Sequence, residues 1–235
     1  MKKGKLYLIP APLGEYSPHV MPEKNLEILR ELNQFIVEEL RSARRFLKKA
    51  GVIRDLNDEM FLIFNEHNQE NDLSLFLQPA LQGIDIGLLS EAGIPCVADP
   101  GNLIVELAHQ SGIRVVPLVG PSSIFLALMA SGFNGQHFIF YGYLPVDRGP
   151  RISKIRELEK AAREKDQTQI FIETPYRNLQ LFQTIVETCK EETRLCIAAD
   201  LTLENEWIKS QTIREWKKRQ PEINKHPAIF LLYHE

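Results

Sequence analysis

The chain has 235 residues, of which 44% are hydrophobic and 25% are charged. This composition is that of a globular protein and excludes disordered and collagen-like chains. The formal net charge is −3, so no overall positive field attracts nucleic acid, and contact with RNA has to rest on local basic patches. No run approaches the roughly 18 apolar residues of a membrane span, and the apolar run near the N-terminus is too short for a signal-peptide core. We therefore expect a soluble, cytoplasmic protein.

The three cysteines, Cys96, Cys189 and Cys196, form an odd set without a Cys-x-x-Cys pair. This argues against a disulfide framework and against a zinc site. We expect buried thiols and no metal.

The first half of the chain alternates apolar runs of strand length with segments of helical spacing. Strands are expected at 5–10, 34–37, 60–64, 84–89 and 114–118, and helices at 23–32, 42–50, 72–81, 103–111 and 122–130. Such alternation predicts a mostly parallel sheet with helices on both faces, and ligand-binding loops at the carboxyl ends of its strands.

From about residue 133 the strands become shorter. They are expected at 138–141, 168–172, 194–199 and 229–233, with helices at 151–164 and 178–189. We predict an α/β protein with an N-terminal α/β domain over 1–119 and a second, mixed α/β domain over 120–235. Because no Pro/Gly/Ser-rich linker separates the halves, the default ligand site is a cleft between them.

Three loops carry the chemistry. Residues 88–101 (LLSEAGIPCVADPG) form a loop much longer than the usual βα connection of about 2–6 residues, which favours a binding loop over a plain connection. Residues 10–14 (PAPLG) follow the first strand but lack the Gly-x-Gly-x-x-Gly pattern, which argues against a phosphate cradle. A compact loop that contacts the uncharged edge of an adenosine stays open as an interpretation. Residues 118–123 (LVGPSS) connect a strand to a helix whose N-terminus Ser122 can cap. Taken by itself, this pattern is that of an ordinary helix start.

In this order and spacing, the segments resemble the tetrapyrrole-methylase superfamily, and more closely its ribosomal RNA small-subunit methyltransferase I family. The family's Pro-x-Pro-x-Gly, Ser-Asp-Ala-Gly-Thr-Pro and Pro-Gly-Pro-Ser elements correspond to residues 10–14, 90–95 and 119–122. A His-Asn pair, a Gly-Phe-Leu-Pro element and a Tyr-Glu-x-x-His-Arg element correspond to Glu66-His67-Asn68, residues 142–145 and residues 172–177. The similarity spans residue 5 to about residue 233.

The resemblance implies the two-domain tetrapyrrole-methylase fold, S-adenosylmethionine in the cleft between the domains, and a homodimer. It implies 2′-O-ribose methylation of small-subunit ribosomal RNA, with no metal and no membrane or DNA partner. The residues that it places at the methyl donor are mostly small or apolar: Leu13, Ser90, Ala92, Gly93, Val97, Ser122, Ser123, Tyr143, Leu144, Leu201 and Ala228.

The chain departs from the family mainly where the acceptor is expected to lie. The Glu-Asp-Thr-Arg motif reads Glu38-Glu39-Leu40-Arg41, and the Asp and Thr of the central loop are Glu91 and Ile94. The histidine of the Tyr-Glu-x-x-His-Arg element is Tyr176, and residues 199–203 (ADLTL) lose both basic residues of Arg-Glu-Leu-Thr-Lys. The resemblance therefore supports donor binding more firmly than it supports any one acceptor.

A ribose hydroxyl needs a base to take its proton. The candidates are Glu38, Glu39 and Glu173, of which Glu173 could equally be a structural partner of Arg177. Two basic clusters can hold RNA phosphates or can be solvated helix faces. They are Arg41, Arg44, Arg45, Lys48 and Lys49, and Arg148, Arg151, Lys154 and Arg156.

Other basic residues and one histidine carry less weight. Lys209 and residues 217–219 are interpreted as ordinary surface, and His67 is either catalytic or a cap of the next turn. Besides the RNA methyltransferase, two functions stay open: a methyltransferase for a tetrapyrrole or another small acceptor, and a non-catalytic protein that binds S-adenosylmethionine or RNA.

Overall fold

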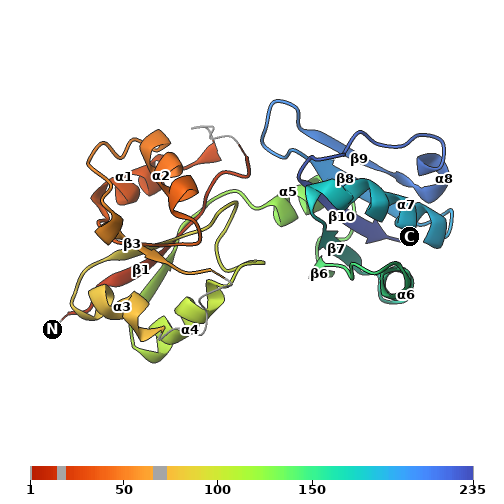
Figure 1. The fold of residues 1–235 in the computed structure, drawn as a ribbon. Coiled ribbons are helices and arrows are strands. Elements are labelled where there is room, and N and C mark those ends of the chain that lie inside the picture. Colours follow the sequence, from red (N-terminus) through yellow and green to blue (C-terminus); the bar gives the residue numbers. More distant parts are fainter. Residues whose placement is uncertain (1, 15–19, 66–72, 235) are drawn as a thin grey trace. The chain divides into compact units, whose positions relative to one another are not determined.

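The computed structural model describes residues 2–14, 20–65 and 73–234. The chain divides into two compact units, Met1–Ser122 and Ser123–Glu235. Each unit has its own five-stranded sheet, and the units are drawn in red to green and in green to blue in Figure 1.

The first unit is built on a parallel sheet with the strand order β3-β2-β4-β1-β5. Its strands are β1 (Lys5–Ile9), β2 (Phe35–Val37), β3 (Phe61–Ile63), β4 (Ile86–Leu89) and β5 (Arg114–Pro117). Ile9 pairs with Leu89, and Leu8 pairs with Pro117. Because the strands are parallel and in this register, β1, β4 and β5 all end at the same edge of the sheet.

Helices cover both faces of this sheet (Figure 1). They are α1 (Glu23–Glu31), α2 (Leu40–Lys49), α3 (Ser74–Leu81) and α4 (Asn102–Gln110). Phe35 and Val37 belong to one buried cluster with residues of α1 and α2, whereas Ile36 belongs to a second with residues of α3 and α4. Successive strand residues thus point to opposite, covered faces, as the continuous apolar runs predict.

The second unit has a mixed sheet with the strand order β6-β7-β10-β8-β9. Its strands are β6 (Phe138–Tyr143), β7 (Thr168–Ile172), β8 (Arg194–Ala199), β9 (Trp207–Thr212) and β10 (Ala228–Tyr233). Only the β6–β7 pair is parallel, because β10 runs antiparallel between β7 and β8, and β9 pairs antiparallel with β8. The helices are α5 (Ser123–Ser131), α6 (Arg148–Lys165), α7 (Asn178–Thr188) and α8 (Ile213–Trp216).

The predicted fold class is confirmed: a parallel α/β unit is followed by a mixed one. The prediction missed β9 and α8. Strand β9 lies at the edge of its sheet, and its sequence Trp-Ile-Lys-Ser-Gln-Thr contains only two apolar residues. An edge strand with polar side chains lacks the apolar alternation on which strand prediction depends.

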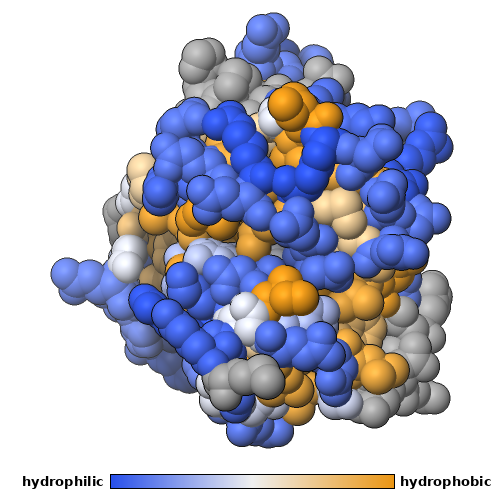
Figure 2. Space-filling model, turned by 90° about the vertical axis from the view of Figure 1, so that its left-hand side faces the viewer, coloured by the Kyte–Doolittle hydropathy of each residue, from blue (hydrophilic) through white to orange (hydrophobic). Residues whose placement is uncertain are grey.

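In the described part of the chain, no helix combines the length and the apolar character that crossing a bilayer requires. Figure 2 shows one face of the molecule, where hydrophilic side chains are interspersed with smaller hydrophobic areas. This mixture is that of an ordinary protein surface.

Candidate functional site

Two of the three predicted binding loops are tied together at the carboxyl edge of the first sheet. The amide of Ala11, in the loop after β1, donates to the carbonyl of Gly93, in the loop after β4, at 2.8 Å. The amide of Gly93 donates back to the carbonyl of Ala11 at 3.0 Å, which makes an isolated antiparallel bridge. The structure therefore brings together loops that lie far apart in the sequence.

The third loop, after β5, packs against the first two at glycines. A Cβ on Gly120 would lie 2.3 Å from Cβ of Pro10, closer than two carbons can approach. Gly93 has a φ of +73°, in the left-handed region, and a Cβ there would lie 3.1 Å from Cδ2 of Leu13 and 3.4 Å from the carbonyl oxygen of Pro121. Only glycine allows this close approach without strain.

Asp99 holds the far end of the central loop. Both of its carboxylate oxygens accept from the amide of Cys96, at 3.0 and 2.9 Å, and one also accepts from the amide of Gly101 at 2.8 Å. Cys96 and Ala98 have φ values of 67° and 60°, so this segment is held in a strained conformation. Burial raises the pKa of Asp99, and the two amide donors oppose that shift.

The cysteines are free thiols: Cys189 and Cys196 are buried and Cys96 is partly buried. Burial raises the pKa of Cys196 to about 12, and burial and the nearby Asp99 raise that of Cys96 to about 12. These thiols therefore stay protonated and unreactive near neutral pH.

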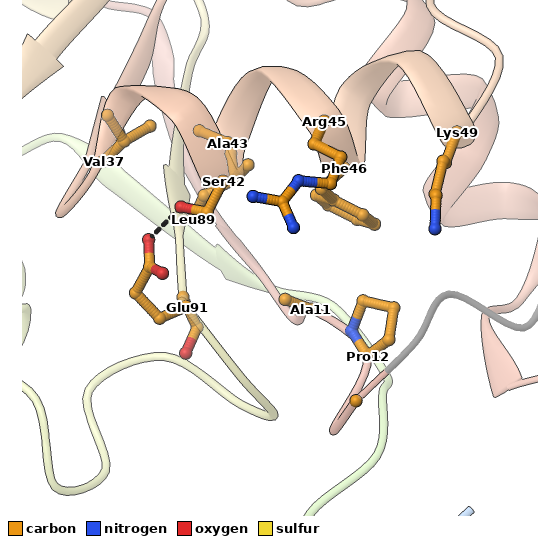
Figure 3. Close-up of a pocket in the computed structure, with 12 residues that line it drawn as sticks. Ala11, Pro12, Val37, Ser42, Ala43, Arg45, Phe46, Lys49, Leu89 and Glu91 are labelled. Atoms are coloured by element: carbon orange, nitrogen blue, oxygen red, sulfur yellow. Dashed lines mark hydrogen bonds between the residues drawn. The ribbon is translucent and has the colours of Figure 1, made fainter. Parts of the chain in front are cut away.

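A cavity of about 320 Å³ lies beside the joined loops (Figure 3). Its lining comes from the loops after β1 and β4, from the ends of β2 and β4, and from α2. The lining residues are Ala11, Pro12, Gly14, Val37, Ser42, Ala43, Arg45, Phe46, Lys49, Leu89, Ser90 and Glu91. The hydroxyl of Ser42 donates to the carboxylate of Glu91 at 2.7 Å, joining α2 to the central loop.

Arg45 and Lys49 stand one turn apart on α2 and are exposed. In Figure 3 both side chains extend from the helix toward Ala11 and Pro12. Neither forms a hydrogen bond or ion pair with any residue that the structure describes. The cavity therefore offers two positive charges to an anionic ligand, next to the loops predicted to bind the methyl donor.

Glu39 positions α2. Its carboxylate accepts from the amides of Arg41 and Ser42, at 2.7 and 2.6 Å, and so caps the N-terminus of the helix. These bonds, first that from Arg41, lower the pKa of Glu39. Both oxygens of Glu39 are thus used to anchor the helix that carries Arg45 and Lys49.

The other residues of the first predicted basic cluster do not line the cavity. Arg44 bonds to the carbonyl of Leu56 at 3.0 Å and forms an ion pair with Asp58. Arg41 and Lys48 are exposed. Ser42 and Phe46, which sequence reasoning passed over, do line the cavity, and only the helical spacing from Arg45 and Lys49 could have indicated them.

In the second unit, four of the five predicted donor residues share one edge of the mixed sheet. Tyr143, at the end of β6, pairs with Ile172, and Ala228, at the start of β10, pairs with Ala199. Leu144 directly follows β6, and Leu201 lies two residues after the end of β8, so both lie at this edge. Leu144, Leu201 and Ala228 are buried, Tyr143 is exposed, and Ser123 begins α5.

Glu173 follows β7 at the same edge, and its side chain is fully buried. Its Oε1 accepts from the amide of Thr174 at 2.7 Å and from Nε and Nη2 of Arg177 at 3.0 and 2.6 Å. Its Oε2 has no hydrogen-bond partner among the described residues. Glu173 therefore is a partner of Arg177, with one oxygen left for another donor.

Most residues of the second predicted basic cluster are bound to acidic side chains or backbone carbonyls of the protein. Arg148 forms an ion pair with Glu187 at 3.0 Å, and Lys154 with Glu157 at 2.7 Å. Arg151 is buried and donates to the carbonyl of Val146 at 2.9 Å. Exposed Arg156 is the member of this cluster without a described partner.

The segment Glu66-His67-Asn68 lies outside the described residues, so its predicted roles have no structural counterpart here. Where the structure is described, no group of three or more His, Cys, Asp or Glu side chains converges as a metal site would.

Comparison with known proteins identifies the chain. Residues 5–217 match the family of Tetrapyrrole (Corrin/Porphyrin) Methylases. The chain is a tetrapyrrole methylase. This methylase is 30% identical over 231 residues to "Ribosomal RNA small subunit methyltransferase I" of Vibrio cholerae, covering 97% of the chain and 76% of that relative.

Proteins of the same name from two further bacteria are similar. The one from Haemophilus influenzae is 29% identical, covering 97% of the chain and 78% of the relative. The one from Mesorhizobium japonicum is 34% identical, covering 89% of the chain and 67% of that relative. The chain therefore belongs to this branch of the family, and it is a methyltransferase.

A solved structure agrees on the fold. The "Crystal structure of the methyltransferase CobJ" superposes with a TM-score of 0.62 at 18% identity, covering 98% of the chain and 94% of that protein. At this identity the likeness concerns the fold alone. Methyltransferases of this family take the methyl group from S-adenosylmethionine.

Replacing Gly120 by alanine tests the contact between the loops. The new Cβ collides with the ring of Pro10, so the loops after β1 and β5 must separate, at a cost of about 1–3 kcal/mol. We expect a lower thermal midpoint and weaker binding of S-adenosylmethionine in a calorimetric titration. Gly135→Ala is the matched control because a Cβ there meets nothing within 4 Å. Equal donor affinity in the two variants would contradict the assigned loops.

Proposed function

We propose that this methylase transfers a methyl group from S-adenosylmethionine to a ribose 2′-hydroxyl of small-subunit ribosomal RNA. One observation carries the proposal: the joined loops and two cations without a partner among the described residues, Arg45 and Lys49, line one cavity. The relatives named for small-subunit ribosomal RNA support the same acceptor. Action on ribosomal RNA implies a cytoplasmic enzyme, and the homodimer that the resemblance implies belongs to the same proposal.

The residues at the edge of the first sheet fit a methyl donor of this kind. Gly93 and Gly120 let the backbone approach closely, and the sequence has no Gly-x-Gly-x-x-Gly pattern of a phosphate cradle. We propose that these loops hold the adenosine and methionine portions mainly through backbone groups. The donor residues of the proposal on this unit are Leu13, Ser90, Ala92, Gly93, Val97 and Ser122, and those on the second unit are Ser123, Tyr143, Leu144, Leu201 and Ala228.

S-adenosylmethionine supplies a methyl group on a sulfonium, which is a good leaving group. The chain has to align an acceptor oxygen with that methyl group, and alignment of this kind contributes up to about 7–11 kcal/mol. Arg45 and Lys49 hold a phosphate of the acceptor strand and so fix the ribose beside the donor loops. Glu39, as the cap of α2, positions both cations through the helix.

We propose Glu91 as the base that takes the proton of the ribose hydroxyl. Of the carboxylates that the structure describes, Glu91 is the one that lines the cavity. The hydroxyl of Ser42 orients the Glu91 carboxylate with a hydrogen bond of 2.7 Å. Of the bases predicted from the sequence, Glu39 is engaged as a cap and Glu173 is paired with Arg177. Glu38, which follows β2 at the same sheet edge, stays a second proposal.

The acceptor is tested by transfer of labelled methyl from S-adenosylmethionine to small ribosomal subunits from cells lacking this gene. Subunits from normal cells are the control, because their target is already methylated. We expect label on a ribose in the deficient subunits only. Donor binding without such transfer would contradict the proposed acceptor. Transfer to a tetrapyrrole instead would show a small-molecule methyltransferase.

The phosphate role of α2 is tested with two neighbouring lysines. Lys48 and Lys49 are both exposed in the last turn of α2, but only Lys49 lines the cavity. We expect Lys49→Ala to weaken RNA binding and to reduce the slope of log affinity against log salt by about 1, whereas Lys48→Ala has little effect. The idea fails if the two variants bind RNA alike.

Glu91→Gln tests the base. The amide keeps the shape and the bond from Ser42 but cannot take a proton, so kcat should fall by about 10²–10⁴-fold. Donor affinity in calorimetry should stay unchanged, and Glu106→Gln, at an exposed position of α4, is the control. An unaltered kcat in Glu91→Gln would remove this residue from the mechanism.

A further inference from the structure

The second unit contains a hollow of about 400 Å³ formed by β9, α8 and the segment that follows α8. Both tryptophans of the chain, Trp207 and Trp216, line it. Lys209 and Arg219 line it as well, together with amide side chains such as Gln211. Basic residues that look scattered along the sequence therefore gather around aromatic rings.

Strand geometry explains the gathering. Trp207, Lys209 and Gln211 occupy alternate positions of β9 and so share one face of the strand. Trp216, from α8, lies against this face with its ring centroid 6.1 Å from that of Trp207 and the rings inclined by 65°. Trp216 is buried, and its Nε1 donates to the carbonyl of Leu195 at 2.9 Å. Trp216 is thus a fixed support, and Trp207, which is 36% exposed, is the accessible ring.

Two cations at this hollow are available to a ligand. Lys209 lies over the ring of Trp216, 6.0 Å from its centroid, and forms no hydrogen bond or ion pair with any described residue. Arg219 is 85% exposed and lies 3.9 Å from Glu222, which is itself 95% exposed, so this ion pair is weak. The neighbouring Arg214 and Lys217 are by contrast paired with acidic side chains.

Two acidic residues, Asp200 and Glu222, line the hollow beside these cations. Asp200 is buried, and its carboxylate accepts from Nδ1 of His226 at 2.6 Å and from the amide of Asn205. Both bonds go to Oδ2, so this oxygen of Asp200 is engaged within the protein. The hollow presents an aromatic face, the amide side chains of Gln211 and Gln220, and the cations of Lys209 and Arg219.

We propose that this hollow binds one nucleotide of single-stranded RNA, with its base stacked on Trp207 and its phosphate on Lys209 and Arg219. Aromatic faces flanked by cations bind single strands in this way, because every base has a π-face and every nucleotide a negative charge. The site would be a second RNA contact besides the one proposed for Arg45 and Lys49 on α2. That the ligand is RNA rests on the proposed function.

Direct binding tests the site without the methyl donor. A fluorescently labelled single-stranded oligoribonucleotide is titrated with the full chain, and its anisotropy gives the Kd. Stacking is worth about 1–3 kcal/mol per base, so Trp207→Ala should raise the Kd about 5- to 150-fold. Trp207→Phe, which keeps a stacking face, should restore most of the affinity.

Two lysines supply the matched control for charge. Lys209→Gln should weaken binding. Lys218→Gln should not, because Lys218, in the segment after α8, is exposed but does not line the hollow. The site is overturned if Trp207→Ala binds like the unmodified chain, if the two lysine variants bind alike, or if an acidic peptide binds through Trp207 and the oligoribonucleotide does not.

The two proposals can fail separately. Trp207-dependent RNA binding without methylation of ribosomal subunits would refute the proposed function and support the hollow. Methylation of subunits together with binding that is indifferent to Trp207 would refute the hollow and support the function.

Discussion

The pair of backbone hydrogen bonds between Ala11 and Gly93 is the constraint on which the candidate site depends. It joins the loops after β1 and β4, and the close contact of Gly120 with Pro10 brings in the loop after β5. These contacts are possible because three parallel strands end at one edge in matching register. A loop held only at its own ends could not present its backbone so rigidly to a ligand.

Charge then gives this edge its proposed chemistry. The chain as a whole is acidic, yet α2 places Arg45 and Lys49 at the cavity without described partners, while Arg44 is neutralised by Asp58. The departure from the family motif at Glu91 has a structural counterpart, since the carboxylate reaches the hydroxyl of Ser42. Glutamate extends one methylene farther than aspartate, and in this chain its carboxylate ends at Ser42 of α2.

The second unit shows how tertiary contacts redefine residues that a sequence pattern leaves ambiguous. Glu173 is both a predicted base and a possible partner of Arg177, and its fully buried side chain makes that ion pair. Trp207, Lys209 and Trp216 have no distinctive spacing, because the first two come from an edge strand and the third from a short helix. The packing of α8 against β9 brings them to one hollow.

The sequence by itself determined the α/β class, most helices and strands, and the three loops, because apolar periodicity and the Gly and Pro positions are local signals. It also indicated the family, since the motifs occur together and in order. Only the tertiary structure decided that Glu39 caps α2, that Arg45 and Lys49 line a cavity while Lys48 does not, and that Glu91 meets Ser42. The direction of a side chain and its partners depend on which elements pack together, and no local pattern encodes contacts between residues so distant in the chain.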